Sequence, residues 1–117
     1  MHQYRELRVW QQAKNIAVTT YQITSKFPKE ELYGLSSQIR RAAVSIASNI
    51  AEGAGRNTKK EFKRFLSIAQ GSCYELETQI IIAEELGLIE NYKLEPYLLQ
   101  LNEVQKMNAS LQKSLDR

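Results

Sequence analysis

The stretch TKKEFKRFLSIAQGSCYELETQIIIAEE, residues 58–85, carries the strongest helix-start signal in the chain. It begins with Thr58 and has Glu61 three residues later, which is the spacing of a capping box at the start of a helix. Apolar side chains then recur every three or four residues and so share one face of a helix. That face consists of Phe62, Phe65, Leu66, Ala69, Cys73, Leu76, Ile80 and Ala83. The stretch therefore predicts a long amphipathic helix with one face in a core.

Three more segments have the same helical periodicity, at about residues 4–26, 35–52 and 92–115. The first ends at Phe27-Pro28, because proline disfavours a helical conformation in the residue before it. The second ends at Gly53, a residue suited to a left-handed helix cap. These breaks predict four successive helices.

The composition favours an all-helical fold. The chain has 117 residues, with only two prolines and five glycines, too few for a sandwich or barrel of many short strands. At this length we expect one domain, residues 1–117. The predicted fold class is all-α, an antiparallel up-and-down four-helix bundle.

The scarce cysteine and histidine exclude several classes of protein. One cysteine, Cys73, rules out an internal disulfide framework, and with His2 as the only histidine a Cys/His zinc site within one chain is excluded. No apolar run reaches the ~18 residues that span a bilayer, and the start of the chain lacks a secretory segment. We expect a reduced cytoplasmic protein that needs no membrane.

Enzyme chemistry finds little support. His2 stands near the terminus, and no Ser, Cys or Lys has a histidine partner at a recognisable spacing. Di-metal bundles use Glu-x-x-His pairs, for which histidines are lacking. Residues 53–60 lack the spacing of a phosphate loop and are better explained as a helix-capping turn. We expect no catalytic residue, no metal and no cofactor.

Charge is unevenly distributed along the chain. Residues 40–64 hold seven basic and two acidic residues, a local +5, whereas residues 75–95 hold six glutamates and one lysine, a local −5. Cations at a helix N-terminus oppose the helix dipole, so local stability does not explain them. An external phosphate would satisfy both the cations and the exposed amides, which makes nucleic acid a reasonable partner. The alternative is a solvated basic end that aids solubility.

Two features of the central helices predict close contacts. Arg41, Ser45, Ser48, Asn49 and Glu52 form a polar stripe of short side chains, which either packs against something or is ordinary surface. The third helix has Gly71 at its middle, at a cost of about 1 kcal/mol relative to alanine. We expect another element to approach closely there.

Surplus apolar surface predicts a homo-oligomer. The apolar side chains of the first helix, including Trp10, cover an arc of roughly 200°, more than one core face needs. Tyr74, Ile81 and Ile82 lie off the core face of the third helix. Left exposed, these side chains would form apolar patches. We expect Trp10, Tyr74, Ile81 and Ile82 at a subunit interface that joins the first helix of one copy to the third helix of the next.

Several ordered blocks together resemble a known family. They are ELRVWQ (residues 6–11), FPKEE (27–31), QIRRAAVSI (38–46), SNIAEG (48–53) and FLSIAQGS (65–72). The chain is similar along nearly its whole length to the 23S ribosomal RNA intervening-sequence proteins, also called the four-helix-bundle protein family. That resemblance implies an up-and-down bundle whose relatives form ring-shaped homopentamers and are encoded within insertions in bacterial 23S rRNA genes.

A related branch extends what the resemblance implies about partners. The accessory variability determinant proteins of diversity-generating retroelements bind nucleic acid through a basic surface and associate with a reverse transcriptase. Carried onto this chain, the family pattern falls on Arg40, Arg41, Ser45, Asn49, Glu52, Gly53, Arg56, Gly71, Ser72 and Glu75. The chain departs from it at Ala47, where relatives often have proline, and at Gln70, where they often have arginine.

The hairpin of the second and third helices gives some of these residues a structural role. A tight turn places Arg40 and Arg41 near Gly71 and Ser72, with Glu75 one turn beyond. Charge signs then predict an ion pair between Arg40 or Arg41 and Glu75. Arg40, Arg41, Ser45, Asn49, Glu52 and Glu75 are therefore structural or binding residues.

The predicted function is non-enzymatic binding of structured RNA or RNA/DNA by an oligomeric bundle, through phosphate contacts. The expected contact residues are Arg56, Lys59, Lys60, Lys63 and Arg64. Partners would be further copies of the chain, the nucleic acid, and a reverse transcriptase or other protein. The alternative is a ring-shaped protein-interaction scaffold with no direct nucleic-acid role.

Overall fold

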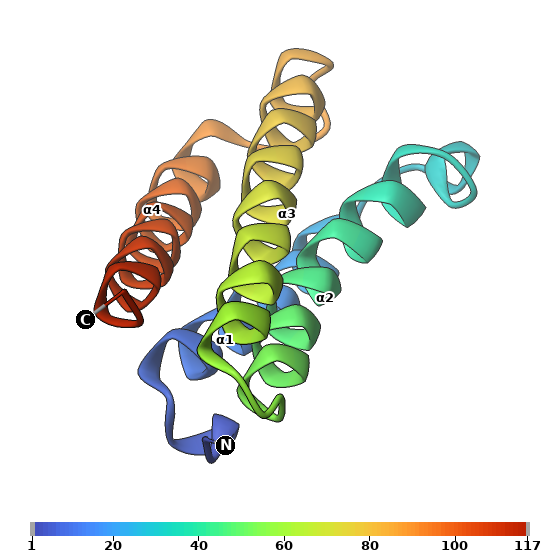
Figure 1. Cartoon of the computed structure of the whole chain (residues 1–117). Coiled ribbons are helices and arrows are strands. Elements are labelled where there is room, and N and C mark those ends of the chain that lie inside the picture. Colours follow the sequence, from blue (N-terminus) through green and yellow to red (C-terminus); the bar gives the residue numbers. More distant parts are fainter. Residues whose placement is uncertain (1, 117) are drawn as a thin grey trace.

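A computed structural model describes residues 2–116 and contains four long helices. They are α1 (Arg8–Thr24), α2 (Leu35–Ala54), α3 (Lys59–Glu85) and α4 (Asn91–Ser114), with short 3-10 helices η1 (Tyr4–Glu6) and η2 (Lys29–Glu31). Each long helix packs against two others, in the order α1, α2, α3, α4 and back to α1 (Figure 1). Short connections make successive helices antiparallel. The predicted all-α four-helix bundle is confirmed.

The first helix begins later than predicted. Leu7 has an extended backbone (φ −74°, ψ 122°), which separates η1 from α1. This break lets η1 fold back, so that the Tyr4 ring meets the Trp10 ring edge-on with 5.0 Å between centroids. Leu7 itself packs against the core. The predicted start at residue 4 was wrong because a tertiary contact overrides the helical period there.

The end of α2 also differs from the prediction. The helix continues through Gly53 to Ala54, and Gly55 at its C-cap has φ −85°, a right-handed conformation. Gly53 is therefore no left-handed cap. A β-carbon there would lie 2.7 Å from the Phe65 Cβ and 3.0 Å from Phe62 Cδ1, so Gly53 permits the close approach of α3.

The left-handed glycine lies after α3 instead. Gly87 has φ +79°, the one positive φ in residues 2–116. Its N–H donates to the Glu84 carbonyl, and the Leu88 N–H donates to the Ala83 carbonyl, each at 2.9 Å. This pair of bonds is a Schellman motif, which ends α3 and turns the chain toward α4.

The start of α3 confirms half of the predicted capping box. The Thr58 hydroxyl accepts a hydrogen bond from the Glu61 N–H at 3.1 Å. The Glu61 carboxylate does not return to the Thr58 N–H among the described residues, and lies 4.0 Å from the Arg56 guanidinium.

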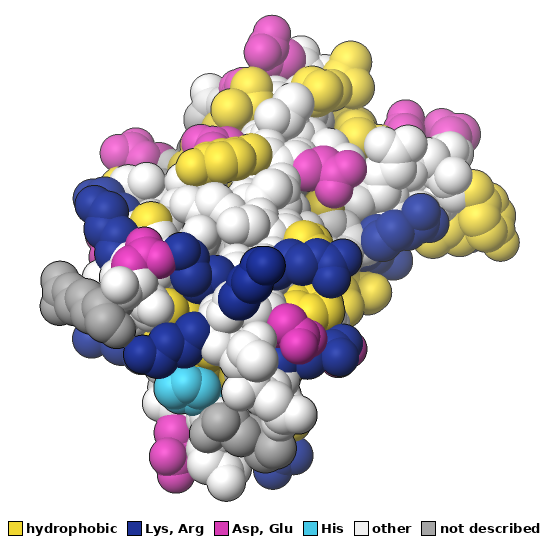
Figure 2. Space-filling model, viewed as in Figure 1, with side chains coloured by type: hydrophobic (Ala, Val, Ile, Leu, Met, Phe, Trp, Pro, Cys, Tyr) yellow, Lys and Arg dark blue, Asp and Glu magenta, His cyan; other side chains and the backbone are white. Residues whose placement is uncertain are grey.

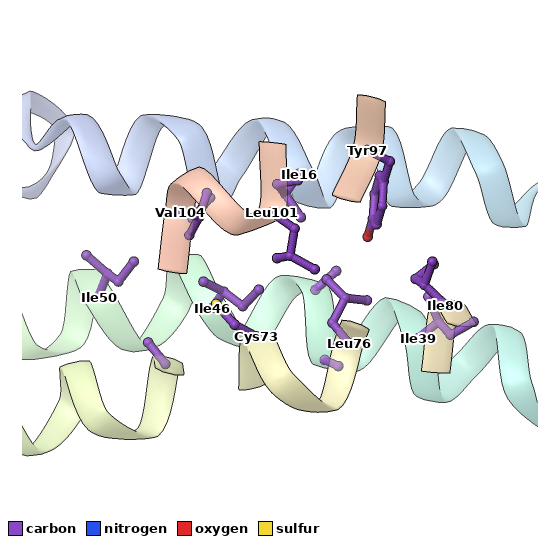
Figure 3. Close-up of a cluster of buried hydrophobic side chains, with 14 of the residues drawn as sticks. Ile16, Ile39, Ile46, Ile50, Cys73, Leu76, Ile80, Tyr97, Leu101 and Val104 are labelled. Atoms are coloured by element: carbon purple, nitrogen blue, oxygen red, sulfur yellow. The ribbon is translucent and has the colours of Figure 1, made fainter. Parts of the chain in front are cut away.

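The core is a column of side chains from all four helices. Ile16 of α1, Ile46 of α2, Leu76 of α3 and Leu101 of α4 meet at its centre, each 1% exposed or less (Figure 3). Phe62, Leu66, Ala69, Cys73, Ile80 and Ala83 line the α3 face as predicted. At ~25 cal/mol per Å² of buried apolar surface, this column supplies the main driving force for folding.

Polar contacts attach α4 to its neighbours. The buried Tyr97 hydroxyl shares a hydrogen bond of 2.7 Å with the Thr20 hydroxyl of α1. The buried Asn108 amide donates to the Leu66 carbonyl at 2.8 Å and to the Gln70 side-chain oxygen at 2.7 Å, both on α3. These bonds fix the position of α4 along the bundle, since sliding the helix would leave buried polar groups unpaired.

The helical pair that carries the basic residues is closely packed near its turn. α2 and α3 make the most extensive contact of the bundle and diverge from their connecting turn toward the other end (Figure 1).

In the described part of the chain, every helix is too short or too polar to span a bilayer.

Candidate nucleic-acid interface

Basic side chains gather around the turn between α2 and α3. Arg56 precedes α3, and the first two turns of that helix carry Lys59, Lys60, Lys63 and Arg64. All are exposed except the half-buried Lys63. Figure 2 shows a band of lysine and arginine side chains across the middle of this face, with several acidic side chains above it. The charge separation seen along the sequence is therefore also a separation in space.

Arg56 and Arg64 both lie against one aromatic ring. The Arg56 guanidinium is 4.8 Å from the Phe65 ring centroid and that of Arg64 is 5.8 Å from it, within cation–π range. Arg56 also pairs with Glu52 at 2.8 Å. Phe65 is half-buried at the edge of the core face, whereas the sequence placed it with the core residues. The periodicity was correct, but it did not reveal that this ring supports two cations.

The lysines of this surface differ in their surroundings. Lys63 pairs with Asp116, which follows α4. Among the described residues Lys60 makes no ion pair, so its charge is available at the start of α3. Of the predicted contact residues, Lys60 and Arg64 are the least engaged by carboxylates.

The two consecutive arginines of α2 point to different neighbours. Arg40 donates from Nε to the Thr24 hydroxyl at 2.8 Å, and its guanidinium lies 4.7 Å from the Tyr21 ring centroid, both on α1. Arg41 lines a hollow on the α3 side together with Glu75. Among the described residues neither arginine is within 4.0 Å of the Glu75 carboxylate. The predicted ion pair is wrong: Arg40 is directed to α1, 100° around the helix from Arg41, and Arg41 lines the same hollow as Glu75 without pairing with it.

The polar stripe of α2 packs against α3. The Ser45 and Ser72 hydroxyls are 3.0 Å apart and share a hydrogen bond. The Asn49 amide donates to the Ser45 carbonyl at 2.8 Å and to its hydroxyl at 2.9 Å. Of the two interpretations left open by the sequence, the packed one is correct for Ser45, whereas the hydrogen bonds of the Asn49 amide stay within α2.

The close contact expected at Gly71 lies elsewhere. No atom comes within 4 Å of a β-carbon built at Gly71, so this glycine faces open space. Gly53 has the close contact instead.

The predicted interface residues are mostly exposed. Tyr74 is 54% exposed, Ile81 40% and Ile82 45%. Trp10 is half-buried beneath Tyr4, where η1 covers part of the wide apolar arc of α1. The apolar surface of α1 that remains exposed belongs to Val18 and Tyr21.

The described residues offer little for metal binding or nucleophilic chemistry. Within residues 2–116, no three His, Cys, Asp or Glu side chains lie close enough to hold a metal ion. Burial, with a smaller contribution from the Glu77 carboxylate, raises the pKa of the Cys73 thiol to about 12 and keeps it protonated. His2 packs on Phe62 with 5.0 Å between ring centroids.

Sequence reasoning missed Gln79. Its side chain is 9% exposed and lines the same hollow as Arg41 and Glu75, and its oxygen has no hydrogen-bond partner. The available sign was an amide directly before three consecutive isoleucines, residues 80–82.

Comparison with family models identifies the bundle. The model of the 23S rRNA-intervening sequence protein family matches residues 5–110, from η1 into the last turns of α4. This chain is a 23S rRNA-intervening sequence protein. The residues matched by the family model include the basic turn, the hydrogen bond between Ser45 and Ser72, and the hollow lined by Arg41, Glu75 and Gln79. No curated protein matches the sequence significantly.

Proposed function

We propose that this intervening-sequence protein is non-enzymatic and binds RNA or RNA/DNA in the bacterial cytoplasm, through phosphate contacts to the basic surface at the α2–α3 turn. The observation that carries the proposal is the placement of exposed cations at the N-terminus of α3. They oppose the helix dipole, while the unpaired first amides of the helix attract anions. A bound phosphate would pair with both the cations and the unpaired amides.

The Phe65 ring supports the same function. By holding the Arg56 and Arg64 guanidinium groups at its surface, it fixes two donors that suit phosphate oxygens in a bidentate geometry. Holding the arginines in place before binding lowers the entropy lost when the ligand arrives.

The active form is proposed to be a closed homo-oligomer, with five subunits by family resemblance. Exposed Tyr74, Ile81 and Ile82 support an interface on α3. A ring would repeat the basic turn and bind one nucleic acid with avidity. The same apolar surface favours the alternative function, a scaffold that recruits a reverse transcriptase or another protein and has no direct nucleic-acid role.

A salt-dependent binding assay separates the two functions. Fluorescence anisotropy with labelled RNAs of unrelated sequence is expected to show binding that weakens steeply with salt. Replacing Lys59, Lys60 and Lys63 together by glutamine is expected to weaken all RNAs alike and to flatten the salt dependence. The matched control replaces Lys14, Lys29 and Lys93, which changes the net charge equally elsewhere. Equal affinity of the two triple variants at low salt would favour the scaffold.

A further inference from the structure

A small polar hollow lies between α2 and α3, beyond the hydrogen bond of Ser45 and Ser72. Its volume is about 360 Å³, at the lower end of the range for small-molecule sites. Its lining comes from residues 38–45 of α2 and 75–79 of α3. These parts of the two helices lie away from the connecting turn, where α2 and α3 diverge (Figure 1). The lining residues are Gln38, Arg41, Ala42, Ser45, Glu75 and Gln79.

Gln79 shows that this hollow is more than a gap between helices. Its side chain is nine-tenths buried, and its buried oxygen, Oε1, has no hydrogen-bond partner among the described residues. Leaving a buried amide oxygen unpaired is unfavourable to folding, and native proteins rarely do so. A leucine of similar size would avoid that penalty, so the amide suits a group that enters the hollow and pairs with it.

Arg41 and Glu75 define the charge that such a group can carry. They line the hollow from opposite helices and are not paired with each other. The Glu75 carboxylate repels a phosphate, and the Arg41 guanidinium repels a bare cation. The suitable ligand is a neutral group that presents acceptors to the arginine and donors to the carboxylate.

We propose that this hollow holds one unpaired guanine base of the bound RNA, an inference that rests on the proposed function. Guanine presents two acceptors, O6 and N7, which match an arginine fork. Its N1–H and N2–H are adjacent donors, which match the two oxygens of one carboxylate. Adenine, cytosine and uracil each lack such a pair of donors on one edge. The Gln79 amide and the Ser45 hydroxyl complete the contacts.

The hollow is within reach of the basic surface. Arg64 and Glu75 are eleven residues apart on α3, which places them on the same side of the helix about three turns, or ~16 Å, from each other. A single strand whose phosphates contact Arg64 can therefore extend along the α2–α3 seam and place an extruded base in the hollow. Proteins commonly read RNA through such unstacked bases.

The test compares uridine decamers that contain one guanosine, one inosine or one adenosine at the centre. Inosine lacks the N2 amino group and so removes one donor to Glu75. We expect the wild-type protein to prefer guanosine by about 5-fold to 100-fold. Glu75→Gln is expected to abolish the preference over inosine, and Gln79→Leu to weaken the guanosine decamer alone while raising the midpoint of thermal unfolding.

The matched control is Glu77→Gln, the same change two residues away on α3. Glu77 accepts a hydrogen bond from Gln105 of α4 at 3.1 Å and does not line the hollow. The guanosine preference is expected to survive in this variant. If wild-type protein binds all three decamers equally while the lysine triple variant still weakens them, the guanine site is overturned and the proposed function stands.

A second probe tests the guanine site even if the protein binds no RNA. Guanosine 5′-monophosphate is titrated into isotope-labelled protein, and the side-chain amide resonances are followed by NMR. A shift of the Gln79 amide that disappears in Glu75→Gln supports the site even though the RNA function has failed. The same resonance unmoved at millimolar nucleotide overturns the site.

Discussion

Gly53 of α2 and Phe65 of α3 are so close that a β-carbon on the glycine would lie 2.7 Å from the Phe65 Cβ. The same β-carbon would meet the Phe62 carbonyl oxygen at 3.2 Å, so neither neighbour is the free end of a flexible side chain. This contact brings the end of α2 against the start of α3. It thereby positions the Phe65 ring, on which Arg56 and Arg64 lie, at the edge of the bundle.

Gly53→Ala is therefore expected to destabilise the bundle by about 1–3 kcal/mol, the usual cost of overpacking. Gly71→Ala is the matched control, because Gly71 is also helical and has open space around its added β-carbon. That change is expected to stabilise by about 0.5–1 kcal/mol through the lost flexibility of the unfolded chain. Urea unfolding measures both, and the same sign for the two variants would contradict the packing role of Gly53.

Asn108 is expected to be replaceable by an apolar residue but not by a charged one. Its oxygen is buried without a partner, while its nitrogen makes both hydrogen bonds to α3. Asn108→Leu removes the unpaired oxygen but also both hydrogen bonds to α3, and is expected to cost about 1–2 kcal/mol. Asn108→Asp places a carboxylate against two acceptors and is expected to cost about 3 kcal/mol or more. Thermal unfolding of both variants checks the contrast.

Stability is expected to fall in alkaline solution because of Cys73 and Tyr97. Burial raises the pKa of the Cys73 thiol from its usual 9.0 to about 12, and that of the Tyr97 hydroxyl from 10.0 to about 12. Between those values the unfolded chain loses a proton that the folded chain retains, so the free energy of unfolding decreases as pH rises. Below pH 9 both groups are protonated in either state, and their contribution is constant.

Urea unfolding at pH 8 to 11 measures this effect, and Cys73→Ala separates the two groups. Each pKa difference of one unit corresponds to about 1.4 kcal/mol, and pH 11 lies two units above the ordinary pKa of the thiol, so the thiol alone lowers the free energy of unfolding by roughly 2–3 kcal/mol at that pH. In Cys73→Ala the free energy of unfolding is expected to decrease only above pH 10, because Tyr97 is then the one of the two groups that still titrates. If the free energy of unfolding begins to decrease at pH 9 in both proteins, the decrease is caused by groups other than Cys73.

The oligomer is expected to depend on α3. Ile81→Glu places a charge on an exposed apolar residue of the proposed interface, and burying that charge between subunits would be strongly unfavourable. Leu99→Glu is the control, since Leu99 is 62% exposed on α4 and outside that interface. Sedimentation velocity is expected to show dissociation of the first variant alone. A stable wild-type monomer at tens of micromolar, on the order used in such assays, would reject the ring, and a pentameric Ile81→Glu would reject only the interface.

The number of helices, their order and most of their core faces follow from local sequence pattern. The period of 3.6 residues depends only on neighbours a few positions apart, and so does the Thr58 cap. For that reason Leu66, Leu76 and Ile80 were placed correctly before any contact between helices was known. The cluster of cations around one turn could also be predicted, because those residues are close together in the chain.

The contacts between helices could be known only from how the four helices pack. Which glycine permits close approach depends on the distance between two helix axes, so the close contact expected at Gly71 is found at Gly53. Arg40 and Arg41 differ by one position in sequence but contact different helices. The unpaired amide oxygen of Gln79 arises where α2 and α3 diverge. These features depend on how the helices cross in space, and a helical period fixes the face of a residue without fixing what lies opposite it.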